Sequence, residues 1–380
     1  MKKTLGQYFT TSEELQTFIF EKVQHKGECL LEPSFGAGHL LKKFKEYDEN
    51  YPMVCYEIDE TISRVVSSNP KQYFLYCDFI IQPIQKYKTI IGNPPFVKQK
   101  MGNLYLKFIE KCFYSLQEDG ELLFIVPSDF IKLTSASSII TNMTSAGSFT
   151  DFYFPHNEKL FQGASIDVMV FRYQLGLMTN KTMVNKKEMF CNVNRGIITF
   201  SEIEVNGVTV DSLFDVYVGI VSGKDKVYRS SIGNIDVLVD KEKNEKFIFP
   251  ESFPTNNKEI NNHLQKHKSE LLERKIKDFN EENWFEWGAP RNMTSIQNLW
   301  GKPCIYLRNI TRQKEVAFRG TVQYFGGTLL CLVPKNSVNI DDIISHFNSE
   351  EFQRDYIYSN RFKIGHKQVS SVIIKKCHFP

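Results

Sequence analysis

The chain has 380 residues, 42% hydrophobic and 24% charged, which is typical of a soluble globular protein with room for two domains. No apolar run approaches the ~18 residues that a membrane span needs, and none follows the basic start, so neither a span nor a secretory signal is expected. Eight cysteines include no C-x-x-C pair, which argues against a metal site or a disulfide framework and favours the cytoplasm.

The net charge of +3 is unevenly distributed. Residues 284–380 hold 13 Lys and Arg against 7 Asp and Glu, a net +6, which leaves −3 for residues 1–283. A basic segment on a slightly acidic body suits a polyanionic partner. An ordinary solvated surface explains the same counts equally well.

The first half of the chain alternates predicted strands and helices. Apolar runs that predict buried strands lie at 29–31, 53–56, 73–76, 89–91 and 122–126. A helix is predicted over 104–116, and two strand-like runs, 149–154 and 166–173, then follow one another directly. This order predicts an α/β fold with a doubly wound, mostly parallel sheet and an antiparallel pair at its edge. Ligands of such sheets bind beyond the carboxyl ends of the strands.

The alternation ends after Tyr173. Residues 176–204 include the polar run MTNKTMVNKKE and are predicted to be a linker. It would join a first domain, residues 1–175, to a second, residues 205–380. The second contains aromatic clusters, short strand-like runs and glycine-rich turns, so we expect a mixed α+β domain.

The strongest motif is Asn93-Pro94-Pro95-Phe96 at the end of an apolar run. Two consecutive prolines fix their φ angles and lack an N–H, so the turn is stiff. The carbonyls of Asn93 and Pro94 are suited to accept two hydrogen bonds from an NH2 group, which holds its lone pair toward an electrophile such as a sulfonium methyl. Phe96 would serve as a stacking plate. A purely structural turn is the alternative, but the position after a buried strand favours catalysis.

Groups suited to a nucleotide-like ligand follow three successive predicted strands. Gly36 and Gly38 permit a tight turn and a close approach of the backbone to a ligand. Glu57 ends the next run about 20 residues later, the spacing expected of an acid that binds ribose hydroxyls. Asp78 and Phe79 end the third run and offer a carboxylate and a ring to an adenine. Each acid alone is more typical of a surface carboxylate or a helix cap.

In this order the motifs resemble the gamma-type amino methyltransferases of restriction-modification systems, the class typified by the Taq adenine methyltransferase. The resemblance runs from Gly6 to Tyr173 and includes the lead-in LGQYFT, although Thr11 stands where many members have proline. It implies a class I S-adenosylmethionine methyltransferase fold with a seven-stranded sheet, followed by a target recognition domain. It also implies S-adenosylmethionine as cofactor and double-stranded DNA as partner, with the N6 of a flipped-out adenine as the methylated atom.

Cofactor contacts are implied by the same resemblance. Thr10 and Glu32 would hold the methionine part and Glu57 the ribose. Ile58 and Phe79 would enclose the adenine, whose amino group Asp78 would bind. The implied cofactor-binding residues are Thr10, Glu32, Pro33, Gly36, Gly38, Glu57, Ile58, Asp78 and Phe79.

DNA contacts are expected in three places. Phe161 would stack on the flipped adenine opposite Phe96. Residues 218–223 and 326–330 resemble recognition-domain strands and turns. Basic residues after the catalytic turn and in the second domain are candidates for phosphate and base contacts, though each alone is typical of an ordinary surface charge. They are Lys98, Lys100, Arg291, Arg308, Arg312, Arg361 and Lys363.

Other substrates of the same chemistry remain open. Ribosomal RNA is the closer competitor as substrate, since the same amino chemistry serves there. Protein glutamine N5-methyltransferases carry N-P-P with an aromatic residue, but usually have a helical domain before the glycine loop and end soon after the sheet. Cytosine N4 chemistry goes more often with Ser or Asp in the place of Asn93, and the intact motifs disfavour an inactive DNA-binding subunit. We therefore expect a monomeric, adenine-specific type II modification enzyme, for which a cognate restriction endonuclease is a candidate genetic partner.

Overall fold

The chain forms two compact units in the computed structural model, which describes residues 8–99, 102–155, 160, 167–202, 204, 207–354, 356–358 and 361–375. Unit 1 covers Met1–Val205 and unit 2 covers Asn206–Pro380. In the described part of the chain, no helix is long and apolar enough to cross a membrane. The assignment of catalysis to one unit and recognition to the other stays a prediction.

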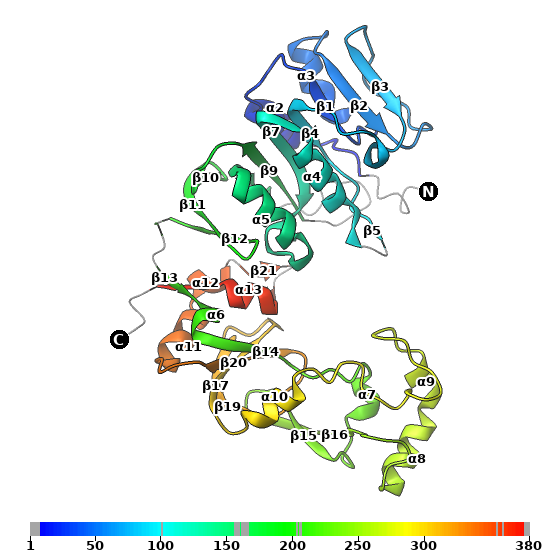
Figure 1. Cartoon of the computed structure of the whole chain (residues 1–380), viewed down its shortest axis with the longest axis vertical. Coiled ribbons are helices and arrows are strands. Elements are labelled where there is room, and N and C mark those ends of the chain that lie inside the picture. Colours follow the sequence, from blue (N-terminus) through cyan, green and yellow to red (C-terminus); the bar gives the residue numbers. More distant parts are fainter. Residues whose placement is uncertain are drawn as a thin grey trace. The chain divides into compact units, whose positions relative to one another are not determined.

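Unit 1 is built on one sheet (Figure 1). Its central strands are β1 (Leu30–Glu32), β2 (Met53–Glu57), β3 (Gln72–Tyr76), β4 (Tyr87–Gly92), β7 (Leu116–Pro127), β8 (Gly147–Tyr153) and β9 (Val168–Leu175). Their order is β8-β9-β7-β4-β1-β2-β3, and the five strands from β7 to β3 run parallel. β9 is antiparallel to both β7 and β8. The predicted doubly wound, mostly parallel α/β sheet is confirmed.

The segment predicted as a linker, residues 176–204, instead extends this sheet. It forms β10 (Lys181–Val184), β11 (Lys187–Asn194) and β12 (Ile197–Ser201), and β10 pairs in parallel with β8. The linker prediction is therefore wrong, and the sheet has ten strands instead of seven. The antiparallel pair β8–β9 is present as predicted, but it lies inside the sheet and not at its edge.

Apolar side chains pack on both faces of the sheet. Successive residues of a buried strand point to opposite faces, so neighbours along one strand belong to different clusters. Leu31 and Ile90 pack in one apolar cluster with residues of α4 (Leu104–Tyr114) and α5 (Ser137–Ala146). Leu30 and Ile91 pack in a second cluster with residues of α2 (Glu13–Lys22) and α3 (Lys42–Tyr47). This double cover leaves the strand ends as the places where polar side chains can gather.

A buried ion pair lies near the amino ends of β4 and of the part of β7 that pairs with it. Arg172 Nε donates to Glu121 Oε2 at 2.9 Å, and the two side chains are 2% and 0% exposed. The Glu121 carboxylate also accepts the N–H groups of Gln24 and His25 and the hydroxyl of Thr89 at 2.9–3.2 Å. The protein itself thus supplies both a counter-charge and hydrogen bonds to this carboxylate.

Unit 2 combines short helices with antiparallel strands (Figure 1). Its main sheet has the order β14-β20-β17-β19, from β14 (Phe214–Val218), β20 (Leu329–Pro334), β17 (Pro303–Arg308) and β19 (Ala317–Thr321). α11 (Ile340–Asn348) contributes Ile343 and Phe347 to the apolar cluster that this sheet shares with α13 (His366–Ser371). A second small sheet has the order β18-β22-β21, from β18 (Ile310–Thr311), β22 (Arg361–Lys363) and β21 (Ile357–Tyr358).

The remaining elements of unit 2 are short. Two further strand pairs are β13 (Gly207–Thr209) with β23 (Ile373–Lys375), and β15 (Ile235–Asp240) with β16 (Lys243–Phe247). The helices are α6 (Val210–Leu213), α7 (Asp225–Tyr228), α8 (Lys258–Lys266), α9 (Lys268–Leu272), α10 (Met293–Asn298) and α12 (Glu350–Arg354).

Candidate functional site

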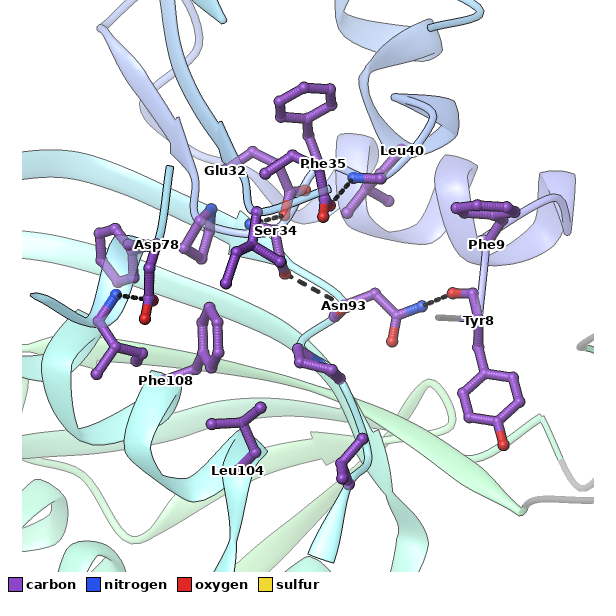
Figure 2. Close-up of a pocket in the computed structure, with 18 of the residues that line it drawn as sticks. Tyr8, Phe9, Glu32, Ser34, Phe35, Leu40, Asp78, Asn93, Leu104 and Phe108 are labelled. Atoms are coloured by element: carbon purple, nitrogen blue, oxygen red, sulfur yellow. Dashed lines mark hydrogen bonds between the residues drawn. The ribbon is translucent and has the colours of Figure 1, made fainter. Parts of the chain in front are cut away.

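A cavity of about 330 Å³ opens at the carboxyl ends of four parallel strands in unit 1. Glu32 ends β1, Glu57 ends β2, and Asp78 and Asn93 follow β3 and β4 within two residues. Figure 2 shows Asp78 and Asn93 on opposite sides of this cavity. Parallel strands in a doubly wound sheet place ligands at this edge, so the predicted location of the site is the one that the fold favours.

The turn after β1 brings backbone close to the cavity. Gly36 has a φ of +53°, and a Cβ atom there would lie 3.0 Å from two ring atoms of Phe9. Its N–H donates to Glu57 Oε2 at 2.9 Å, while the N–H of Asp59 donates to Oε1 at 3.0 Å. Glu57 is therefore fixed by two backbone groups at the cavity wall. Each of its oxygens keeps further lone-pair capacity for a ligand.

Gly38 has a different role from Gly36. Its φ is +83°, and a Cβ atom there would meet Val66 Cγ2 at 2.8 Å. Gly38 does not belong to the residues that line the cavity. The glycine therefore permits the turn and its packing, and the prediction of a direct cofactor contact receives no support from this geometry.

Glu32 is a buried carboxylate with little compensation. It is 1% exposed, and Ser34 donates its N–H to Oε1 at 3.3 Å. Burial raises the pKa of Glu32 well above its ordinary range, and the charge of Glu57 acts in the same direction, while the Ser34 N–H lowers the pKa. A cationic ligand group in the cavity would relieve this desolvation.

One wall of the cavity is formed by the segment after β3. Asp78 accepts the N–H of Ile80 at 2.8 Å and so caps the short helix η2 (Phe79–Ile81). The ring of Phe79 stacks on that of Phe108 with centroids 5.9 Å apart. Lys111 donates to the carbonyls of Phe79 and Ile80 at 2.6 and 2.8 Å, and its burial lowers its pKa. These contacts connect the segment to α4 (Leu104–Tyr114).

The Asn93 amide lies in another wall of the cavity. Its Nδ2 donates to the Tyr8 carbonyl at 2.7 Å and to the Thr10 hydroxyl at 3.0 Å, and Figure 2 shows the first of these bonds. The backbone carbonyl of Asn93 accepts the Ser34 hydroxyl at 3.4 Å. In contrast, Asn93 Oδ1 is buried and has no hydrogen-bond partner among the described residues. An unpaired buried acceptor costs free energy, so an oxygen left in this state beside a cavity indicates a ligand donor.

The rest of the motif supports this amide. Pro95 lines the cavity, whereas Pro94 and Phe96 are not among its lining residues. The Phe96 ring is partly buried and stacks on the Tyr8 ring, with centroids 6.1 Å apart and an interplanar angle of 28°. The Tyr105 ring meets Phe96 edge-on at 6.1 Å. Phe96 is therefore held in place from two sides beside the cavity.

Most of the predicted cofactor residues come together in the structure. The cavity is lined by Thr10, Glu32, Pro33, Gly36, Glu57, Ile58, Asp78 and Phe79. Residues that the sequence reasoning gave no role include Ser34, Phe35, His39, Leu40, Val97, Gln99, Lys107 and Phe108. Tyr8 and Phe9 also line the cavity, and they belong to the lead-in motif LGQYFT, from which their position could have been predicted. Nothing in the sequence singled out His39, whose pKa is lowered by burial and by the charge of Lys42.

Arg308, a predicted DNA contact, is instead part of the packing of unit 2. It is 5% exposed, and its Nε and Nη2 contact Asp240 Oδ1 at 2.8 and 2.6 Å. Its guanidinium also donates to the Glu315 carbonyl and lies 4.9 Å from the Phe318 ring centroid. Because these partners occupy a buried group, the geometry contradicts a phosphate contact at Arg308.

Other predicted cations are exposed; two lie on one small sheet, and a third directly follows one of its strands. Arg361 and Lys363 alternate with buried Phe362 on β22, so both point to the exposed face. Arg312 is exposed and follows Thr311, which pairs with Phe362. Lys98, on β5 (Lys98–Gln99) shortly after the turn Asn93–Phe96, and Arg291 are exposed elsewhere. Lys100 and Phe161 lie outside the described residues.

Part of unit 1 is similar in sequence to known proteins. Residues 38–161 match the family model of the Eco57I restriction-modification methylase. The Type II methyltransferase M.HincII of Haemophilus influenzae is 28% identical over 198 residues, which are 46% of this chain and 38% of that protein. The modification methylase CviBIII of Paramecium bursaria Chlorella virus NC1A is 31% identical over 150 residues, 33% of this chain and 39% of that protein. The predicted resemblance to restriction-modification methyltransferases is confirmed.

These matches cover less than two fifths of the length of the two relatives. Among solved structures, the DrdV–DNA complex aligns with 90% of this chain and 50% of its own, with 12% identity and a TM-score of 0.48. The type I methyltransferase subunit from Streptococcus thermophilus aligns with 51% of each chain, with 16% identity and a TM-score of 0.40. Within the described residues, His, Cys, Asp and Glu form no group of three or more that could hold a metal ion.

Proposed function

We propose that unit 1 is an S-adenosylmethionine-dependent methyltransferase that modifies the N6 amino group of an adenine in double-stranded DNA. The observation that carries this proposal is the hydrogen bonding of the Asn93 amide. Its nitrogen donates to Tyr8 and Thr10, whereas its buried oxygen has no hydrogen-bond partner among the described residues. An exocyclic NH2 group is a donor that such an oxygen accepts. The matches to restriction-modification methylases support DNA as the molecule that carries this NH2 group.

The cavity suits S-adenosylmethionine in charge and in shape. The buried Glu32 carboxylate would receive the cationic methionine end, which offsets the desolvation of its charge. Glu57, held by two backbone N–H groups, would bind the ribose hydroxyls. The adenine would lie between Ile58 and Phe79 with its amino group toward Asp78. The close approach of Gly36 to Phe9 leaves no room for a side chain at this wall.

The residues of the chain then act on the amine. When bound, S-adenosylmethionine supplies an electrophilic methyl group. Asn93 Oδ1 accepts one N–H of the target amine, and the Pro94 carbonyl is the proposed second acceptor. These two bonds orient the nitrogen lone pair toward the cavity, so no general base is needed before attack. The ring of Phe96, held by Tyr8 and Tyr105, would stack on the base once it leaves the duplex.

Unit 2 is proposed to recognise the DNA. Its small sheet β18-β22-β21 presents Arg312, Arg361 and Lys363 as exposed cations, which suit phosphate contacts. Sequence choice would then be made outside the catalytic cavity, because the cavity contacts only the flipped base. Such a protein would serve as the modification enzyme of a type II restriction-modification system, and Phe161 would be its second stacking residue.

The proposal is tested by offering methyl-labelled S-adenosylmethionine with duplex DNA, ribosomal RNA and a release factor in parallel reactions. Label is expected in DNA alone, as N6-methyladenine at one short sequence. Asn93→Ala serves as the matched control for contaminating activity and should transfer almost no label. Label in RNA or protein with none in DNA would overturn the proposal.

A further inference from the structure

The Asn93 amide is a two-ended group whose orientation decides whether it can hold an amine. An NH2 group needs an acceptor, and only Oδ1 of the amide is one. If the amide were rotated by half a turn, Nδ2 would face the amine and donor would meet donor. The structure must therefore contain something that keeps the nitrogen away from the cavity.

The segment from Tyr8 to Thr10 supplies this constraint. The Tyr8 carbonyl can only accept, so at 2.7 Å it must face Nδ2 and would repel Oδ1. The Thr10 hydroxyl accepts the second N–H at 3.0 Å, in a position that is 5% exposed. With both hydrogens of Nδ2 engaged, the amide is held at two points, and Oδ1 is the one polar atom of the group left for a ligand.

Thr10 is itself fixed, which makes it a suitable anchor. Its carbonyl accepts the side-chain amide of Gln16 at 2.7 Å, and Gln16 lies on α2 and is 5% exposed. The Tyr8 ring stacks on Phe96 at the other end of the same segment. Three residues thus join a packed helix to the amide acceptor and to the proposed base-stacking ring.

We infer that Thr10 is a positioning residue for methyl transfer: the Tyr8 carbonyl selects the end of the Asn93 amide that faces it, and the Thr10 hydroxyl accepts the second N–H and so holds the amide in the orientation that presents Oδ1 to the target amine. This role differs from the cofactor contact that the family resemblance implies for Thr10. A cofactor contact acts on cofactor affinity, whereas an orienting contact acts on the rate at saturating cofactor. The inference rests on the proposed function.

The test compares Thr10→Val, which keeps the shape and loses the hydroxyl, with Thr10→Ser, which restores it. One hydrogen bond removed from the amide should lower kcat about tenfold in Thr10→Val, while the Kd for S-adenosylhomocysteine, measured by calorimetry, changes about twofold or less. Thr10→Ser should recover most of the lost kcat. Thr11→Val, at the exposed neighbouring position, should match the unmodified chain. If Thr10→Val does not fold, Thr10→Ala removes the same hydroxyl with a smaller side chain.

A second comparison uses Asn93→Ala as background. Because Thr10 is inferred to act through the amide, Thr10→Val should cost nothing further once the amide is gone. A Thr10→Val variant with normal kcat and a raised cofactor Kd would reduce Thr10 to a cofactor contact and overturn the inference, as would a further loss in the Asn93→Ala background. The proposed function fails differently, since in that case the unmodified chain itself would methylate no DNA.

Discussion

The two ends of the parallel strands in unit 1 differ in how many hydrogen bonds and counter-charges their buried polar groups receive from the protein. Near the amino ends, Glu121 is fully buried and is matched by Arg172, two backbone N–H groups and the Thr89 hydroxyl. At the carboxyl ends, Glu32 is equally buried but receives one N–H at 3.3 Å, and Asn93 Oδ1 receives none from the described residues. The sheet is the same and the residue types are similar.

The difference separates residues that stabilise the fold from residues for which we propose a ligand. A buried polar group with all partners inside the protein contributes to a unique structure, and its removal is felt as lost stability. A buried group with a missing partner reduces stability until a ligand provides that partner. Stability and binding measurements on matched variants therefore test the assignment of each strand end.

The largest expected effect is on stability, at the amino ends. Arg172→Met leaves the buried Glu121 without its counter-charge, so the free energy of unfolding should fall by about 3–5 kcal/mol. Urea unfolding of the two proteins measures this difference. Cofactor affinity of the folded protein should be unchanged, because the pair does not line the cavity. A loss below about 1 kcal/mol would show that the pair is not structurally important.

At the carboxyl ends, the largest effect should be on the reaction. Asn93→Ala removes the proposed acceptor, and by analogy with the loss of one oxyanion-hole donor the rate should fall by about 10²–10³, or about 2.7–4 kcal/mol in the barrier. Binding of S-adenosylhomocysteine should stay nearly normal, because the oxygen faces the amine. Single-turnover transfer of labelled methyl groups measures the rate, and near-normal turnover would refute the role of Asn93.

Glu32→Gln should change stability and binding in opposite directions. The raised pKa of Glu32 means that the folded state binds its proton more tightly than the unfolded state does. Stability of the ligand-free protein should therefore fall as pH rises from about 4.5 toward the raised value. The neutral amide removes this loss, so the variant should be more stable than the unmodified chain at pH 8, and this difference should shrink as the pH falls to 5.

The cofactor should bind Glu32→Gln about tenfold more weakly, because the charge that would face its cationic end is gone. Urea unfolding at pH 5 and pH 8 and calorimetric titration with S-adenosylhomocysteine measure the two effects. Glu21→Gln, at an exposed position of α2, is the matched control and should alter neither. A variant that loses stability at pH 8 would place Glu32 with Glu121 among the structural carboxylates.

The candidate site of unit 1 could be predicted from the sequence because its signals are local. Glu57 and Asn93 stand at or directly after the end of an apolar run that forms a buried parallel strand, and Asp78 follows the parallel strand β3, which lies at the sheet edge and is largely exposed. Strand direction then brings them to one edge without knowledge of any other contact. The missing partner of Asn93 Oδ1 could not be predicted in this way, since it depends on where Tyr8 and Thr10 lie in space.

The failures have the same origin. Arg308 also ends an apolar strand, β17, but whether its charge meets solvent or Asp240 depends on a residue 68 positions away. The strands of 176–204 were not predicted because half of the residues of β11 are polar and none of its residues is fully buried. The turn between β10 and β11 uses Asn185 and Lys186, both with positive φ, and lacks the glycine that usually marks such a hairpin.

The smallest effects are expected from single cations of unit 2, where Arg308 and Arg312 repeat the contrast between a satisfied and an available group. Replacing Arg312, Arg361 or Lys363 by Gln should each reduce the slope of log K against log salt by about 1, because each phosphate contact releases about one counterion. Arg308→Gln should leave the slope unchanged and instead lower stability, since its partner Asp240 would lose its counter-charge. Lys302→Gln, exposed and on no element of the small sheet, is the matched control. Equilibrium binding of a short duplex at several salt concentrations, with urea unfolding of the same variants, measures both quantities. A slope that changes for Arg308→Gln and not for the three exposed cations would reverse the assignment, because it would make the packed guanidinium the DNA contact and the small sheet an ordinary surface.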